Sequence, residues 1–157
     1  TRSPYMMREY WAMPEQTAET LTADGFLRTG DLGSMDELGH ITFQGRARDV
    51  IIRGGENVYP AEVEELLAAH PGVGAAVLVG VDDERLGEQV AGVVVRSPGS
   101  TVTGEELAEY LRDKVARFKI PIAWRFVDGL PMTASGKVRR FVVRDETNAE
   151  LVARAAG

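Results

Sequence analysis

The sequence contains no cysteine and only two histidines among its 157 residues. The absence of cysteine excludes a disulfide scaffold, a thiolate zinc site and a cysteine nucleophile. No apolar run approaches the roughly 20 residues that a membrane-spanning helix needs, and the opening residues do not resemble a signal peptide. We therefore expect no transmembrane segment and a cytoplasmic location.

Basic charge is also scarce. Lys and Arg number 18 against 24 Asp and Glu, which gives a formal net charge of −6. Nucleic-acid binding needs clustered positive charge, so no nucleic-acid partner is expected. Neither His40 nor His70 has carboxylates at ligand spacing, so no metal site is predicted within this chain. The hydrophobic fraction of 44% is that of an ordinary globular protein.

The order of the expected elements predicts an α+β fold or an open α/β sandwich. Pro14 precedes a short helical segment, and turn signals at 24–25 and 36–39 predict a β-hairpin. The elements expected after it are a short strand, a helix opened by Pro60, two β-rich runs, a second helix, a further strand, a loop and a last helix, at 50–52, 60–69, 75–81, 90–95, 103–111, 124–127, 130–137 and from about 139.

Two patterns refine these elements. Thr103 and Glu106 have the spacing of a capping box, which predicts the start of the second helix. Three carboxylates of the preceding helix, Glu62, Glu64 and Glu65, are interpreted as a solvated helix face, because glutamate is usually exposed.

Three segments combine glycine with charged side chains in ways that suit a ligand. Asp31 follows Gly30, and its carboxylate could accept both hydroxyl protons of a ribose, although residue type alone favours a turn-capping aspartate. Residues 45–55 place three arginines and two adjacent glycines around one apolar strand. Arginine offers a fixed fork of donors for phosphate or diol oxygens, but a tight hairpin with solvated arginines would have the same composition.

The third segment, residues 130–137, is a loop of small residues that ends in Gly136 and Lys137. A glycine before the lysine lets the loop swing, and an ammonium is a compact charge suited to phosphate or carboxylate oxygens. A plain loop with a surface lysine is the alternative for this segment.

In this order and at these separations, the three segments resemble the C-terminal part of adenylate-forming enzymes, and most nearly the acyl-CoA synthetases. Residues 27–33 are similar to the ribose-binding motif of that family, and residues 45–64 to its hinge and glycine loop. Residues 130–139 are similar to its catalytic-lysine motif. The resemblance extends from about residue 5 to residue 144.

The resemblance implies an α+β fold, with a small sheet and flanking helices preceded by a β-hairpin remnant of a larger N-terminal lobe. Residues 1–46 would be the tail of that lobe and carry the ribose motif. Residues 47–146 would form the mobile C-terminal lid domain, and residues 147–157 a helical extension. The phosphate loop and magnesium motif of the lobe are absent from the sequence, so Mg²⁺ is expected to bind there and this fragment alone is expected to be inactive.

The family reaction has two steps. A carboxylate attacks ATP to give an acyl-adenylate and pyrophosphate, and the thiol of CoA then displaces AMP after the C-terminal domain has rotated. By position, Lys137 would be catalytic in the first step, Asp31 would bind the ribose hydroxyls and Arg46 would support the ribose or a phosphate. Arg48 would be the hinge, where relatives more often have Asp or Lys.

For the second step, Gly54 and Gly55 would line the pantetheine tunnel, Phe118 would stack on CoA and Lys119 would bind its phosphates. The resemblance therefore implies a carboxylic acid, with fatty acids as the favoured class, ATP, CoA and the protein's own N-terminal lobe as partners. A domain that loads the thiol of a carrier protein and a non-catalytic lid or interaction module remain as alternatives.

Overall fold

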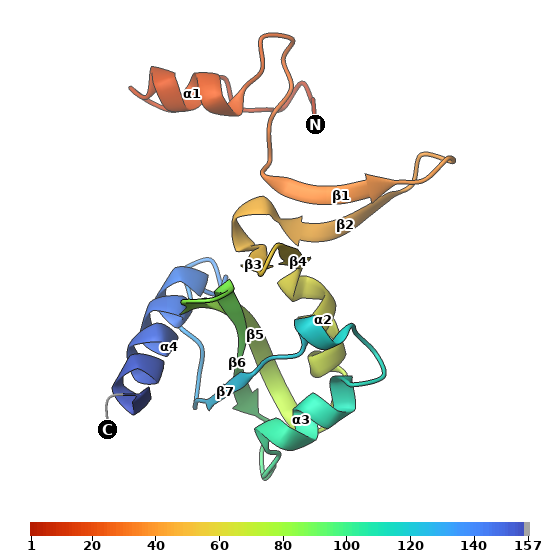
Figure 1. The fold of residues 1–157 in the computed structure, drawn as a ribbon. Helices are drawn as coiled ribbons and strands as arrows, with labels where there is room; N and C mark the ends of the chain where they lie inside the picture. Colours follow the sequence, from red (N-terminus) through yellow and green to blue (C-terminus); the bar gives the residue numbers. More distant parts are fainter. Residues whose placement is uncertain (156–157) are drawn as a thin grey trace. The chain divides into compact units, whose positions relative to one another are not determined.

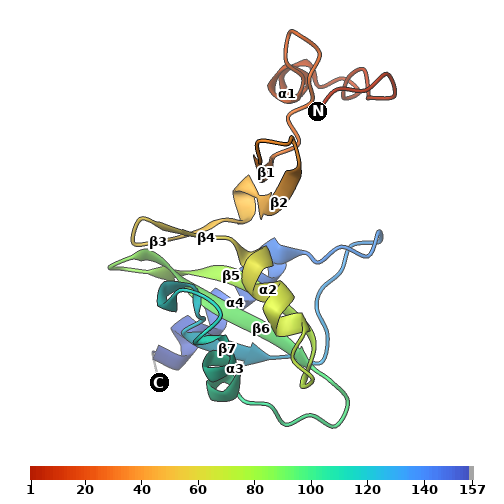
Figure 2. The ribbon, with the colours of Figure 1, turned by 90° about the vertical axis from the view of Figure 1, so that its right-hand side faces the viewer.

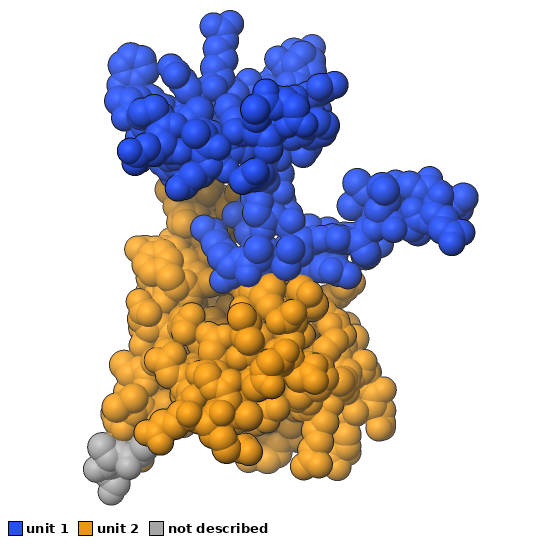
Figure 3. All heavy atoms as spheres, turned by 45° about the horizontal axis from the view of Figure 1, so that its top comes forward, with its two compact units in different colours: residues 1–48 blue, residues 49–157 orange. Residues whose placement is uncertain are grey.

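The structure is a computed structural model and describes residues 1–155. The chain divides into two compact units between Arg48 and Asp49, and Figure 3 colours them separately. The boundary predicted after residue 46 lies close to this division. Each unit is described by itself below.

The first unit has almost no interior of its own. It contains a short helix, α1 (Pro14–Thr20), and a hairpin of two antiparallel strands, β1 (Asp31–Met35) and β2 (Ile41–Arg46). Gly45 is the single buried residue among residues 1–48, all of which the structure describes. The unit therefore exposes the apolar side chains that elsewhere would form a core, among them Trp11, Met35, Ile41 and Phe43.

Asp36 closes the turn of the β1–β2 hairpin. Its carboxylate accepts hydrogen bonds from the backbone amides of Leu38 and His40, and lies 2.9 Å from the Nδ1 atom of the His40 ring. The hydrogen bond to the His40 side chain, with the amide of His40, holds the pKa of Asp36 below its usual value. The hairpin predicted from the turn signals is thus present, and a local side chain fixes its register.

The second unit is built on one mixed sheet (Figure 1). Its strands run in the order β4-β3-β6-β5, and β7 pairs with β6 in parallel. The bounds of these strands are Ile51–Arg53 for β3, Glu56–Val58 for β4, Val73–Asp83 for β5, Gly87–Arg96 for β6 and Ala123–Phe126 for β7. Sequence analysis anticipated all of them except β4, where only the glycine loop was expected.

Helices cover both faces of this sheet. The helices α2 (Pro60–Ala68) and α3 (Gly104–Leu111) lie on one face and α4 (Arg140–Ala155) on the other, as Figures 1 and 2 show. Two short 3-10 turns, η1 (Ala47–Asp49) and η2 (Arg117–Lys119), complete the elements. The α+β architecture predicted from the sequence is confirmed.

The core has two halves because side chains alternate across β5 and β6. Leu78, Val90 and Val94 pack with α2 and α3, whereas Val77 and Val93 pack with Val143 of α4. Each such fully buried side chain stabilises the fold by about 1.5–3 kcal/mol. Both central strands therefore read as nearly continuous apolar runs in the sequence.

The helix boundaries agree with local sequence signals. Pro60 occupies the first turn of α2, where no amide hydrogen is needed. The predicted capping box at α3 is confirmed, since the Glu106 amide donates to Thr103 Oγ1 and the Thr103 amide donates to the Glu106 carboxylate. The last helix is continuous from residue 140 to residue 155, so the expected extension is part of α4; residues 156 and 157 lie outside the described residues.

Substitution of Gly92 by alanine tests the packing of β6. A Cβ atom at Gly92 would lie 2.7 Å from two ring carbons of Trp124, closer than van der Waals contact allows. We expect Gly92→Ala to lower the free energy of unfolding by about 1–3 kcal/mol, the usual cost of overpacking. Gly129→Ala is the control, because no atom lies within 4 Å of its added Cβ. Equal denaturant midpoints for the two variants would contradict this packing.

Candidate functional site

Asp31 and Arg46 lie opposite each other at the open end of the β1–β2 hairpin. They are cross-strand partners, and Arg46 Nε lies 3.3 Å from Asp31 Oδ1. The Thr29 hydroxyl accepts a hydrogen bond from the Asp31 amide, and Gly30 before it has φ +73°, which favours glycine. Both charged side chains are more than one-third exposed. The two residues predicted to bind a nucleotide are therefore neighbours, with polar atoms open to solvent.

Arg48 lies in the 3-10 turn η1, directly before the division between the units. The turn follows β2 without a loop, and the Ala47 amide donates to the Gly30 carbonyl within the first unit. The residue predicted as the hinge thus occupies the last position of the first unit.

Gly54 and Gly55 form the tight turn between β3 and β4. Their φ angles are +58° and +88°, as in the two-residue hairpin turns that need glycine. The Gly54 amide donates to the Leu86 carbonyl, and a Cβ atom at Gly54 would lie 2.9 Å from the Leu86 side chain. No atom lies within 4 Å of a Cβ atom at Gly55. The turn therefore presents open backbone at Gly55.

Lys119 is engaged by a carboxylate. It lies in η2, and its Nζ atom is 2.8 and 2.6 Å from the two oxygens of Glu62 on α2. The Lys119 side chain is only 19% exposed. Phe118 beside it is partly buried against the core cluster of α2 and α3, so one side of its ring is covered. Any phosphate that binds Lys119 has to compete with Glu62.

Lys137 lies in a loop that is closed on itself. The Thr133 amide donates to the Lys137 carbonyl, the Lys137 amide donates to the Thr133 hydroxyl, and Gly136 has φ +76°. Two residues further out on each side of the loop, the Arg139 amide donates to the Pro131 carbonyl. Lys137 itself is exposed, and within residues 1–155 its ammonium has no hydrogen bond or ion pair. The loop thus holds its backbone in one shape and leaves this charge available.

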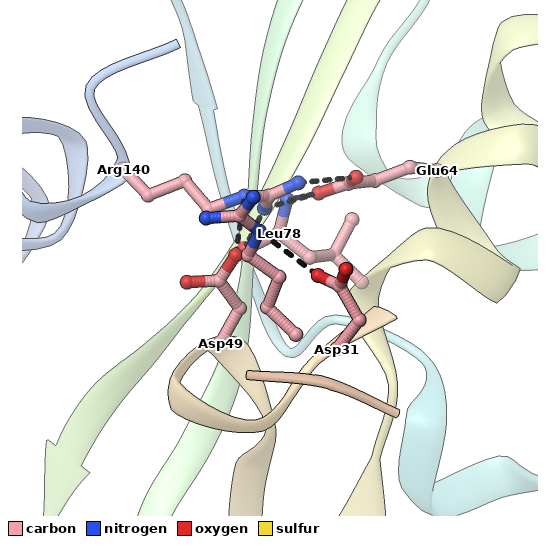
Figure 4. A network of polar contacts seen from close by, with 6 residues as sticks. Asp31, Asp49, Glu64, Leu78 and Arg140 are labelled. Atoms are coloured by element: carbon pink, nitrogen blue, oxygen red, sulfur yellow. Dashed lines mark hydrogen bonds and ion pairs between the residues drawn. The ribbon is translucent and has the colours of Figure 1, made fainter. Parts of the chain in front are cut away.

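At the start of α4, which follows this loop in the sequence, lies a network of polar contacts that sequence analysis missed (Figure 4). The guanidinium of Arg140, the first residue of α4, donates to both oxygens of Glu64 at 2.7 Å and to the Leu78 carbonyl at 3.1 Å. Its Nε atom lies 3.4 Å from Asp49 Oδ2. The Leu78 amide in turn donates to Glu64 at 2.7 Å. The interpretation of Glu64 as part of a solvated face is therefore wrong: its side chain is 15% exposed.

The charge state of Arg140 follows from these contacts. Burial alone would lower its pKa, but the hydrogen bonds and charge of Glu64, with the charge of Asp49, outweigh burial and raise the pKa above its usual value. Arg140 is therefore a permanent cation that joins two carboxylates. The sequence signal that could have identified it is only that Arg140 follows the lysine loop at a helix start.

The described residues contain neither a cluster of metal-ligand side chains nor a helix that could span a membrane. Within residues 1–155, no three His, Asp or Glu side chains come together where they could hold a metal ion. The helices of the same region are too short or too polar for any of them to span a membrane.

The chain is similar in sequence and in structure to known proteins. Residues 62–137 match the family model of the AMP-binding enzyme C-terminal domain. A crystal structure of ATP-bound MatB from Rhodopseudomonas palustris superposes with a TM-score of 0.86 and 40% sequence identity, over 94% of this chain and 29% of that chain.

Two curated relatives carry different names. The chain is 44% identical over 146 residues to the rat mitochondrial medium-chain acyl-CoA ligase ACSF2, covering 93% of this chain and 24% of the relative. It is 46% identical over 143 residues to the fatty acid–acyl-carrier-protein ligase ScoC of Streptomyces coeruleorubidus, covering 91% and 27%. The chain thus spans about a quarter of the length of these relatives. Residues 62–137 of its second unit therefore belong to the C-terminal domain family of the AMP-binding enzymes.

Proposed function

We propose that this chain acts as the C-terminal part of an AMP-forming ligase that activates a carboxylic acid as an acyl-adenylate and transfers it to a thiol. The observation that carries this proposal is the exposed ammonium of Lys137, which has no hydrogen bond or ion pair within residues 1–155 and follows a loop closed by backbone hydrogen bonds. A lysine in that state is free to bind oxygens of a ligand.

In the first step, Lys137 would contact the carboxylate and the α-phosphate of ATP. Negative charge develops on the transferring group, and a cation held there lowers the barrier. Asp31 would accept hydrogen bonds from the ribose hydroxyls, because a carboxylate offers only acceptors. Arg46, which lies 3.3 Å from Asp31, would orient that carboxylate and add a donor for the ribose or a phosphate.

In the second step, the C-terminal domain would turn about Arg48 so that the Gly55 turn faces the acyl-adenylate. Open backbone at Gly55 allows a thin chain such as pantetheine to pass close by. Lys119 would leave Glu62 for a phosphate of CoA, and Phe118 would offer the exposed side of its ring to the adenine. Arg48 is always charged, which suits a pivot that stays in solvent.

The larger partner in this proposal is an N-terminal lobe. The near absence of buried residues in residues 1–48 supports it, because such exposed apolar side chains are usually covered by another surface. The relatives named above are about four times as long as this chain. That lobe would supply the acyl pocket and hold Mg²⁺. The cytoplasm remains the predicted compartment.

CoA is the acceptor we favour, on the sequence of the Gly54–Gly55 turn and the segment that follows it. A carrier-protein thiol is the second candidate, because one relative bears that name. A non-catalytic interaction module is the third, and the joint presence of Lys137, Arg46 and Asp31 argues against it.

The defining experiment measures AMP release from ATP across a panel of carboxylic acids, with CoA or a holo-carrier protein as acceptor. It compares this chain alone, this chain with a separately produced N-terminal lobe, and the intact gene product. We expect AMP only when the lobe is present, and faster thioester formation with CoA. No AMP from the intact product across a broad panel would contradict the proposed function, and a preference for the holo-carrier would contradict the choice of CoA.

Substitution of Lys137 tests its role in the first step. We expect Lys137→Ala to slow adenylation by about 100-fold or more, the usual effect of removing a charge that stabilises the transition state. Thioester formation from supplied acyl-adenylate should stay near the wild-type rate. Lys114→Ala is the matched control, because the Lys114 ammonium donates to the Tyr110 carbonyl at the end of α3. Equal losses in both half-reactions would refute the assigned role.

Two substitutions of Gly55 distinguish the effect of backbone strain from the effect of a side chain that blocks the proposed pantetheine path. Both Gly55→Ala and Gly55→Trp force a side chain onto a residue with φ +88°, so both carry the same backbone cost. Only the tryptophan would also fill the open space above the turn. We expect Gly55→Trp to slow thioester formation more than tenfold beyond Gly55→Ala, with adenylation alike in the two variants. A defect confined to adenylation would contradict the tunnel assignment.

Substitution of Lys119 tests the phosphate contact. We expect Lys119→Met to raise the KM for CoA by about tenfold, the equivalent of one charge-assisted hydrogen bond, with the KM for ATP unchanged. Glu62→Gln, which removes the competing carboxylate, should lower the KM for CoA. Salt dependence of the CoA KM that is identical in wild type and Lys119→Met would argue that Lys119 does not bind the phosphates.

A further inference from the structure

Arg140 joins three separate segments of the second unit. One carboxylate, that of Glu64 on α2, accepts two hydrogen bonds from the guanidinium and one from the Leu78 amide of β5. The guanidinium also reaches the Leu78 carbonyl and Asp49. Helix α2, strand β5, the first residue of the unit and the start of α4 therefore meet at one side chain (Figure 4).

Arg140 lies close to Lys137 in the sequence, so its contacts bear on the loop that carries the lysine. Arg140 is three residues beyond Lys137, and the hydrogen bonds of the intervening loop close within residues 131–139. Because the loop is closed on itself, its orientation on the domain is determined by its two stems. Leu130 and Val138 pack partly buried against the α4 face of the sheet, and Arg140 is the polar anchor of the C-terminal stem.

We propose that Arg140 is a positioning residue that, through its paired contacts with Glu64 and Leu78, aims the loop carrying Lys137. The expected effect on adenylation rests on the proposed function, because the orientation of the loop matters for catalysis only if Lys137 contacts a substrate. Apolar contacts of the stems hold the loop against the sheet, but because such contacts are not directional they still allow the stems to rotate or slide on it. A planar guanidinium held by both oxygens of one carboxylate fixes direction as well.

Asp49 extends the junction to the start of the second unit. It is the residue directly after Arg48, and its Oδ2 atom lies 3.4 Å from Arg140 Nε. The same guanidinium thus connects the stem of the lysine loop with the residue that follows the proposed hinge. Rotation about Arg48 would in this way move the lysine loop together with the rest of the unit.

The closing experiment uses four variants of the intact gene product and of this chain. Arg140→Met removes the anchor, Arg140→Lys keeps one charge without the fork, and Glu64→Gln keeps the size and one acceptor oxygen. Arg144→Met is the matched control: Arg144 lies one turn further along α4 and also pairs with two carboxylates, those of Asp82 and Glu88, neither of which belongs to residues 130–139. Thermal unfolding of each variant reports loss of stability separately.

The first readout is the split between half-reactions. We expect Arg140→Met to slow adenylation by up to about 100-fold, the effect of misplacing a catalytic group by about 1 Å. Thioester formation from supplied acyl-adenylate should change less than threefold, and Arg140→Lys and Glu64→Gln should fall between Arg140→Met and wild type. In a Lys137→Ala background, Arg140→Met should have almost no further effect on adenylation, because a residue that acts through Lys137 cannot add to its removal.

The second readout does not depend on the proposed function. Amide hydrogen exchange of residues 130–139, measured in this chain, should accelerate at least tenfold in Arg140→Met and Glu64→Gln and stay at the wild-type rate in Arg144→Met. Should Arg140→Met fail to fold, Glu64→Gln and Arg140→Lys supply both readouts.

The outcomes separate the two proposals. Adenylation and exchange alike in the Arg140 and Arg144 variants would overturn the positioning role while leaving the proposed function intact. An additive loss in the Lys137→Ala background would also overturn it, since Arg140 would then act by another route. An intact product without ligase activity would refute the proposed function, and the exchange data would still decide whether Arg140 fixes the loop.

Discussion

The antiparallel pairing of β5 with β6 is the interaction on which the second unit depends. The pair runs from Val73 opposite Arg96 to Asp83 opposite Gly87, and its inner side chains are buried on both faces. Neither α2 with α3 nor α4 could bury its apolar stripe without this surface. The sheet separates α2 from α4. The Arg140 side chain at the start of α4 connects the two helices, because its guanidinium donates to the Leu78 carbonyl of β5 and to Glu64 of α2.

Charged pairs in this unit have two different consequences. In the pair of Arg140 and Glu64, the Glu64 side chain is 15% exposed and both of its oxygens accept hydrogen bonds, so separating the pair would leave a carboxylate poorly solvated. The pair of Lys119 and Glu62 is joined at one ammonium, and the Glu62 side chain is 43% exposed. Because the Glu62 carboxylate is solvated, a ligand that takes its place at Lys119 leaves no buried carboxylate unpaired. The first pair therefore suits a fixed part of the domain, and the second suits a ligand contact.

The sequence predicted elements better than contacts. Pro60, the Thr103 capping box and the nearly continuous apolar runs of β5 and β6 are local signals, and the structure follows them. Glu64 was misinterpreted because its residue type predicts solvation, while its partner lies 76 positions away. The pairing of Lys119 with Glu62 spans 57 positions and was missed for the same reason. Strand β4 was not predicted, because its three residues after two glycines are too few to show the alternation of apolar and polar side chains typical of a strand.

The lysine loop illustrates how a mobile charge can still be placed accurately. Hydrogen bonds of Thr133 to residues 136 and 137 remove most internal freedom of the loop, so Lys137 varies mainly through its own side chain and through the stems. In the proposed function, side-chain freedom is required because the ammonium would have to meet a ligand that binds and leaves. Freedom in the stems would instead spread the ammonium over positions that no ligand occupies. An anchor at residue 140 restricts the stems without touching the lysine, and an arginine fork does this better than a single-point contact would.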